Sequence, residues 1–270
     1  MMLYGVLAVI GLGAGITTVL FGFGGGFLMV PVMYQGLILA YGEDSAIGQA
    51  AMHCAVATST SLMIFSSLMA TRKHHKAGTL KWAIIRPLLG FIALGALMGA
   101  AVATWVSSAP LRWLFISYLG ITILDCLFRP GFTAPSSGEV HPLGKVTTAI
   151  GGTLIGGVAA CLGVGGSVMT VPMLRRMGAS MTQATAMASP LTFPVSIAGT
   201  LGFVLFSWQE GQALGGLHLG YIDVLALFAM MAGSWCGIRL ASRWIGKLPD
   251  RLHSRIYIAL LIIFWLAMLL

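Results

Sequence analysis

Two glycine-rich stretches carry the chemistry that this sequence offers most clearly. Residues 20–33, LFGFGGGFLMVPVM, hold three consecutive glycines and a proline within an otherwise apolar run. Glycine costs a helix about 1 kcal/mol per residue and internal proline about 3, so this run is not an uninterrupted helix. A helix that begins after such a break exposes N–H groups with partial positive charge, and glycines let a ligand approach them closely. The pattern predicts an anion site built from backbone amides.

The same pattern recurs in the second half of the chain, in residues 163–174, GVGGSVMTVPML. Three glycines and the proline keep their spacing, so that Gly22, Gly24, Gly25 and Pro31 align with Gly163, Gly165, Gly166 and Pro172. Further along, QAAMHCAVATSTS (49–61) is echoed by QATAMASPLTFP (183–194). We therefore expect two copies of one structural unit, each with its own broken helix.

Neutral polar side chains are the second ingredient of the predicted site. The acidic residues lie in connections or near span ends, whereas a cation pathway or a carboxylate proton relay would need one at a membrane centre. Hydroxyl and amide donors suit an oxyanion instead. We predict a substrate-binding site that combines the glycines with nearby hydroxyl, amide and imidazole groups: Gly24, Gly25, Gly26, Gly165, Gly166, Ser167, Gln49, His53, Thr58, Ser59, Gln183 and Ser189.

These residues also have structural interpretations, which stay open at this point. Gly22 and Gly26 form a GxxxG pattern that brings helices close together, and hydroxyls in a span often bond back to their own helix. A neutral His53 bonded to a backbone carbonyl is the simplest interpretation of that residue. His74 and His75 are expected in a solvated cytoplasmic loop, and Asp125 with Arg129 in an interfacial ion pair.

The composition places the chain in a membrane. It is 58% hydrophobic and 8% charged, with a mean hydropathy of +0.94, whereas about a quarter of the residues in a soluble domain are charged. Apolar runs long enough to cross a bilayer recur from end to end. We therefore expect an all-α polytopic membrane protein. Its start, MMLYGVLAVIGLGAG, has no basic region and no cleavage site, and is expected to be a retained span.

The basic residues set the orientation of the two copies, because Lys and Arg in short loops stay cytoplasmic. If each broken segment enters and leaves on one face, each copy has three full crossings, and the basic residues other than Arg112 fall on or near one side. Residues 167–176 fit this arrangement, since they make only about 15 Å of helix, half a bilayer. An odd number of crossings inverts the second copy. We predict a first membrane repeat at 1–128, a cytoplasmic linker at 129–143 and an inverted second repeat at 144–270, with both termini outward.

The motifs GFGGGFLMVPVM, AVATSTS and HHKAGTLKW resemble the TauE/SafE family of membrane proteins, also called sulfite exporters. The second-half motifs GVGGSVMTVP and AMASP are similar to that family's repeat, and the similarity covers nearly the whole chain. The resemblance implies transport of sulfite, sulfoacetate or another organosulfonate across the bacterial inner membrane. Ser167 in place of a third glycine, and Pro190 where the first half has Ser59, make the two halves of the site unequal.

Energetics favour export of such an anion. With the cell interior negative by 100 mV, expelling one negative charge releases about 2.3 kcal/mol. Uptake would need a co-transported cation or a steep substrate gradient, and the sequence offers no intramembrane carboxylate to bind such a cation.

Other functional classes find less support. The sequence has no HExxH, GxSxG or paired intramembrane aspartates, so no enzyme is expected. Four single cysteines without CxxC spacing predict neither a metal site nor a cofactor, and the net charge of +8 reflects topology and not nucleic-acid binding. An anion channel and an assembly factor for another complex remain alternatives. The expected partners are the small anion and the lipid bilayer, with the choice between monomer and homodimer left open.

Overall fold

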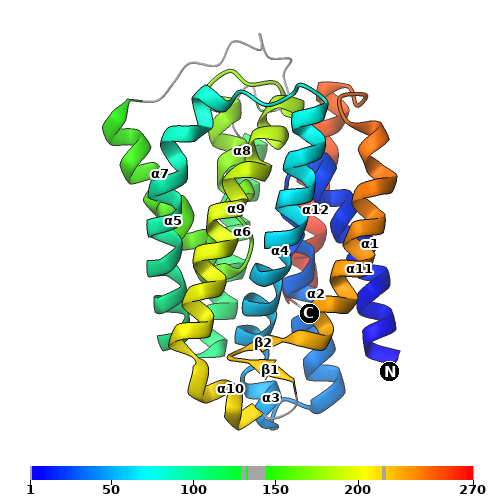
Figure 1. Ribbon diagram of the computed structural model, residues 1–270, viewed down its shortest axis with the longest axis vertical. Coiled ribbons are helices and arrows are strands. Elements are labelled where there is room, and N and C mark those ends of the chain that lie inside the picture. The colour runs from blue at the N-terminus through cyan, green and yellow to red at the C-terminus, as the bar shows by residue number, and fades with distance from the viewer. Residues whose placement is uncertain (1, 129–131, 133–143, 215–216, 270) are drawn as a thin grey trace.

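The computed structural model describes residues 2–128, 132, 144–214 and 217–269, and is an upright bundle of helices (Figure 1). Apart from a two-stranded hairpin of β1 (His218–Leu219) and β2 (Ile222–Asp223), the described elements are helical. The long helices of the first half are α1 (Met2–Phe21), α2 (Gly26–Tyr41), α4 (Ala51–Lys76), α5 (Trp82–Trp105) and α6 (Ser108–Phe128). Those of the second half are α7 (Lys145–Leu162), α8 (Ser167–Arg176), α9 (Met181–Phe206), α11 (Val224–Ala241) and α12 (Asp250–Leu269). Short elements connect them: α3 (Ala46–Gln49), α10 (Trp208–Leu214) and η1 (Ser242–Trp244).

Seven of the described helices are long and apolar enough to cross a membrane, so the chain is an all-α, multi-pass membrane protein. They are α4, α5, α6, α7, α9, α11 extended through η1, and α12. The sequence predicted three crossings per half and did not count α7 among them. With 18 residues α7 also reaches the required length, because its break comes only at Gly163.

Both glycine stretches interrupt helices, as the sequence predicted. α1 ends at Phe21 and α2 begins at Gly26, while α7 ends at Leu162 and α8 begins at Ser167. Gly22, Gly24 and Gly25 have φ values of 75°, 70° and 87°, and Gly163 and Gly165 have 66°. Because residues with a Cβ rarely adopt this left-handed conformation, the glycines determine where each helix breaks.

Each broken segment returns to the end of the bundle from which it starts. The last carbonyls of α1 lie beside His74, near the end of α4, and beside His253, near the start of α12. The following helix α2 runs back to the other end of the bundle, where its Gln35 bonds to the carbonyl of Ala267 near the end of α12. α7 begins and α8 ends at the upper end in Figure 1, which we call the basic end. All described basic residues except Arg112 lie in helix termini or connections near this end: Arg72, Lys73, Lys76, Lys81, Arg86, Lys145, Arg175, Arg176, Arg239, Arg243, Lys247, Arg251 and Arg255.

The two broken segments are held by close helix contacts on opposite sides of the bundle. α1 packs along α11 at one side and α7 along α5 at the other, with α4 and α9 between them (Figure 1). Glycines make both contacts possible: a Cβ at Gly237 would lie 2.0 Å from the Leu12 carbonyl oxygen, and one at Gly99 would lie 2.0 Å from that of Gly157. Backbones can approach this closely only where a side chain is missing.

Adding a single methyl group to α5 tests this packing. We expect Gly99→Ala to lower the apparent Tm of the purified protein, because its Cβ meets backbone that cannot move aside, and overpacking typically costs about 1–3 kcal/mol. Gly90→Ala on the same helix is the control. A Cβ there would have no neighbour within 4 Å, and alanine favours helix over glycine by about 1 kcal/mol, so Tm should rise or stay unchanged. Equal effects of the two substitutions would contradict the packing.

Candidate functional site

The two glycine breaks lie against each other in the centre of the bundle. A Cβ at Gly26 would lie 2.5 Å from the carbonyl oxygen of Gly163, so the first break touches the second. A Cβ at Gly24 and one at Gly165 would both meet the same two side chains, Met63 and Thr192. Residues 22–27 and 163–168 are all buried. The two glycine tracts, which the sequence analysis assigns to one site, are therefore in contact in the structure.

Met63 of α4 and Thr192 of α9 each contact both breaks. The Met63 sulfur would lie 3.1 Å from a Cβ at Gly24 and 2.9 Å from one at Gly165, while the Thr192 methyl would lie 2.7 Å and 3.0 Å away. Thr192 donates its hydroxyl to the Ala188 carbonyl of its own helix. These two side chains therefore fill the space between the breaks in this conformation.

Backbone carbonyls around the breaks are bonded to side-chain donors. Ser66 donates to the carbonyl of Gly24, and Ser59 donates to that of Gly163 at 3.3 Å as well as to Val56 at 2.9 Å. At the end of α1, His74 and His253 donate from Nε2 to the carbonyls of Val19 and Leu20 at 2.9 and 2.8 Å. The carbonyls that the first break exposes are thus covered from both halves of the chain.

Several hydrogen-bond donors around the breaks have no acceptor. Within the described part of the chain, no hydrogen bond satisfies the amides of Gly24, Gly25, Gly165 and Gly166. The hydroxyls of Ser167 and Ser189 are fully buried and are likewise without a partner among the described residues. Because an unsatisfied buried donor is costly, this cluster of open donors is a candidate site for a hydrogen-bond acceptor.

The remaining predicted site residues lie apart from the breaks or are already bonded. Thr58 accepts a bond from the amide of Asp223 at 3.0 Å, at the start of α11. Gln183 forms the capping box of α9 with Ser180, and Gln49 is exposed at the end of α3. The structure does not bring these three side chains to the glycines. These residues lie close to the repeated motifs in the sequence, but contacts with local capping groups and turns determine where their side chains point.

His53 lies at the end of the bundle opposite the basic residues. Its Nε2 donates to the carbonyl of Val106 at 2.8 Å, its Nδ1 lies 2.9 Å from the hydroxyl of Ser108, and its ring stacks on Tyr221. These contacts join α4, the turn before α6 and the hairpin. This environment agrees with the simpler interpretation of the sequence, in which His53 is bonded to a backbone carbonyl, and it lies away from the glycines.

Three charged or titratable residues make contacts that the sequence analysis did not describe. His74 was expected in a solvated loop, but only 2% of its surface is exposed, because α4 continues to Lys76 and turns this ring onto α1. Arg175 is also buried, donating to Asp250 at 2.9 Å and to the Ala179 carbonyl at 3.0 Å. Asp125 pairs with Arg176 at 2.9 Å, whereas Arg129 lies outside the described residues.

Ser66 and Ser67 give a matched test of the first break. We expect Ser66→Ala to destabilise the protein by about 1–3 kcal/mol, because the buried carbonyl of Gly24 would lose its side-chain donor. Ser67→Ala removes a buried hydroxyl that has no partner in the described chain, so stability should be unchanged or slightly higher. Thermal unfolding in detergent measures both. A Ser66→Ala protein as stable as Ser67→Ala would contradict this bonding pattern.

Comparison with known proteins gives a consistent result. The family described as "Sulfite exporter TauE/SafE" matches residues 7–268. A probable membrane transporter protein of Haemophilus influenzae is 27% identical over 239 residues, which cover 87% of this chain and 86% of that protein. No solved structure matches the chain.

Two further relatives carry similar descriptions. The probable membrane transporter protein YdhB of Bacillus subtilis is 22% identical over 202 residues, covering 73% of this chain and 77% of its own length. The probable membrane transporter protein MamO of Magnetospirillum gryphiswaldense is 25% identical over 293 aligned positions, covering 95% of this chain but only 44% of that protein.

Proposed function

This chain belongs to the TauE/SafE family, a family of membrane transporters, and from that premise we propose that it is a secondary transporter of a small anion. The substrate class is sulfite or an organosulfonate such as sulfoacetate, and the direction is export across a bacterial inner membrane. The observation that carries this proposal is the pair of helix breaks that meet in the bundle centre with unpartnered donors. Membrane transporters often place such half-helix starts at their binding sites.

The two halves are related as inverted repeats in this proposal, with 1–128 and 144–270 joined by a cytoplasmic linker at 129–143. Matched packing supports it, because the broken helix of each half lies against the corresponding helix of the other: α1 against α11, and α7 against α5. The glycines at these two contacts also occupy matching positions in the two halves. Gly11 and Gly15 of α1 contact α11, and Gly152 and Gly156 of α7 contact α5.

The anion would be held by dipoles and hydroxyls. The first amides of α2 and α8 carry the partial positive charge of a helix N-terminus, and the glycines before them leave room for close approach. Ser167 and Ser189 add two donors that have no acceptor among the described residues. An oxyanion with several acceptor oxygens would satisfy amides from both breaks at once.

Met63 and Thr192 would gate this site. They fill the space between the breaks, so substrate can enter only after α4 and α9 shift or after the methionine changes rotamer. Methionine suits that role because its unbranched side chain adapts at low cost. In the conformation described here, residues 22–27 and 163–168 of the two breaks are all buried.

Loss of the Ser167 hydroxyl should weaken binding without harming the fold. Sulfite and sulfoacetate should raise the Tm of the wild-type protein more than chloride at equal ionic strength. We expect Ser167→Ala to weaken their apparent affinity roughly tenfold or more, because a hydrogen bond to a charged group contributes about 1.5–3 kcal/mol. The variant should keep the ligand-free Tm, since the hydroxyl has no partner to lose within the described chain.

Ser196→Ala is the matched control, since that hydroxyl donates to Phe193 of its own helix at 2.8 Å. It should leave the anion-dependent Tm shift as in the wild type. If Ser167→Ala binds as tightly as Ser196→Ala does, the site is not at the second break.

The direction of transport predicts a voltage dependence. In proteoliposomes loaded with labelled sulfite, an interior potential of −100 mV should drive net efflux of the anion, since about 2.3 kcal/mol is released per negative charge expelled. Collapsing the potential with valinomycin and equal potassium should abolish that bias. Flux that ignores the potential would overturn uncoupled export of an anion. Flux that rises linearly with concentration, without saturation, would favour a channel.

A further inference from the structure

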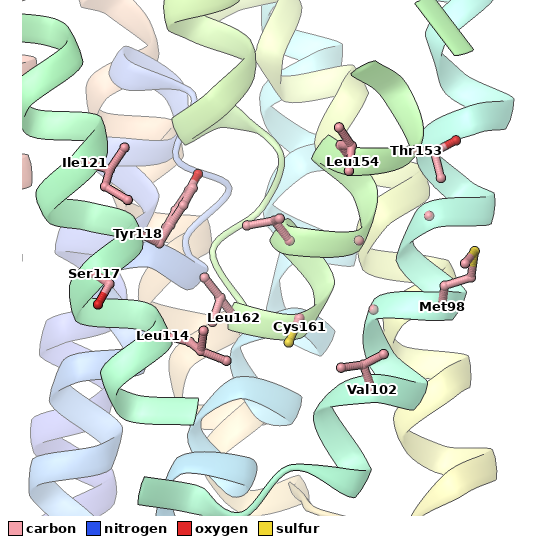
Figure 2. A pocket seen from close by; sticks show the side chains of 14 residues that line it. Met98, Val102, Leu114, Ser117, Tyr118, Ile121, Thr153, Leu154, Cys161 and Leu162 are labelled. Carbon is pink, nitrogen blue, oxygen red and sulfur yellow. The ribbon is translucent and has the colours of Figure 1, made fainter. Parts of the chain in front are cut away.

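A lateral groove between α6 and α7 lies outside the proposed transport site. One cavity of about 530 Å³ lies between α5, α6 and α7, and a second of about 390 Å³ lies between α6, α7 and α8. Both are lined by Tyr118, Ile121 and Leu154, so they are two stretches of one groove. Figure 2 shows Leu114, Tyr118 and Ile121 on one wall with Leu154 and Leu162 across the open space.

This groove opens sideways to the surrounding bilayer. Its walls are apolar, yet Ile121 is 68% exposed and Leu154 is 58% exposed in the isolated chain. From Leu114 to Asp125 the groove follows about 16 Å of α6, close to the ~15 Å depth of one leaflet of the hydrocarbon core. The groove therefore has the polarity and the length of a lipid acyl chain.

The corresponding space beside the first break is filled by protein. There Phe23 stacks on Phe27 and on Tyr257, each with ring centroids 4.9 Å apart. The motif alignment puts Val164 and Val168 at the positions of these two phenylalanines. Smaller side chains at matching positions leave the second break without the aromatic packing of the first.

An arginine stands at the end of the groove that lies at the basic end. Arg176 lines the second cavity and bonds to Asp125 from Nη2. Its side chain is 50% exposed, and among the described contacts its Nη1 and Nε make none. A guanidinium has five donors in a planar fork, so it can hold a phosphate while keeping its carboxylate partner.

We propose that this groove binds one anionic phospholipid from the leaflet at the basic end. One acyl chain lies along α6 and α7, and the headgroup phosphate bonds to Arg176. Ile155 lines the groove and would lie 3.3 Å from a Cβ at Gly166, so the lipid supports the second break from outside.

Native mass spectrometry of the full-length purified protein, titrated with dioleoylphosphatidylglycerol, tests this proposal. The wild type should retain one lipid through the delipidating wash. Ser117→Trp and Leu154→Trp fill the groove from opposite walls, and each should weaken retention at least tenfold. Leu124→Trp is the matched control: it lies on α6, is 53% exposed and does not line either cavity, so retention should be unchanged.

The headgroup contact has its own pair of variants. Arg176→Gln should reduce retention of phosphatidylglycerol several-fold, whereas Lys247→Gln, also at the basic end but away from both cavities, should not. Equal retention by the wild type and both groove-filling variants would overturn the proposal. So would a wild-type dimer that Ser117→Trp and Leu154→Trp convert to monomer, because the occupant would then be a second copy. All variants should keep the Tm of the lipid-free wild-type protein.

Discussion

Helix breaks inside a low-dielectric environment are the constraint on which the rest of this structure depends. Each break frees backbone carbonyls and amides where water is scarce, and every unsatisfied group costs several kcal/mol. In the described residues, several of the freed carbonyls are hydrogen-bonded, whereas several of the freed amides are not. Around the first break the carbonyls of Val19, Leu20 and Gly24 receive bonds from His74, His253 and Ser66. The amides that follow are left open in the described residues, so what the centre lacks is an acceptor.

Close packing of the broken helices makes such breaks tolerable. A helix that ends within the bundle has lost part of its own hydrogen-bond ladder and depends on its neighbours for position. Glycines on α1, α5, α7 and α11 let whole helix faces meet at backbone distance on both sides. Glycine thus has two roles in this structure, at different positions: it allows close helix packing and it breaks the helices.

The sequence indicated the features that local chemistry determines. Broken helices follow from glycines and prolines at fixed spacing, and the ten residues of α8 match the expected short helix. The sequence did not indicate which residues of other helices each polar side chain would contact. His74 looks like part of a charged loop, but one further turn of α4 carries it onto α1. Gln183 resembles Gln49 in sequence, yet capping by Ser180 determines its orientation. Such contacts depend on which helices meet, and residue spacing along one helix does not reveal this.

The binding centre that we propose carries no fixed charge, and this would have consequences for transport. The described arginines and lysines lie near the ends of helices, where they can attract an anion, while the breaks offer only dipoles and hydroxyls. A buried guanidinium would bind an anion strongly and release it slowly, because its own desolvation is repaid only while the anion stays. Neutral donors would release the anion more readily, but they would distinguish anions less well by charge. In the proposed site, selectivity would then come from the shape of the space that Met63 and Thr192 leave when they move, and from how many donors one anion can reach from both breaks.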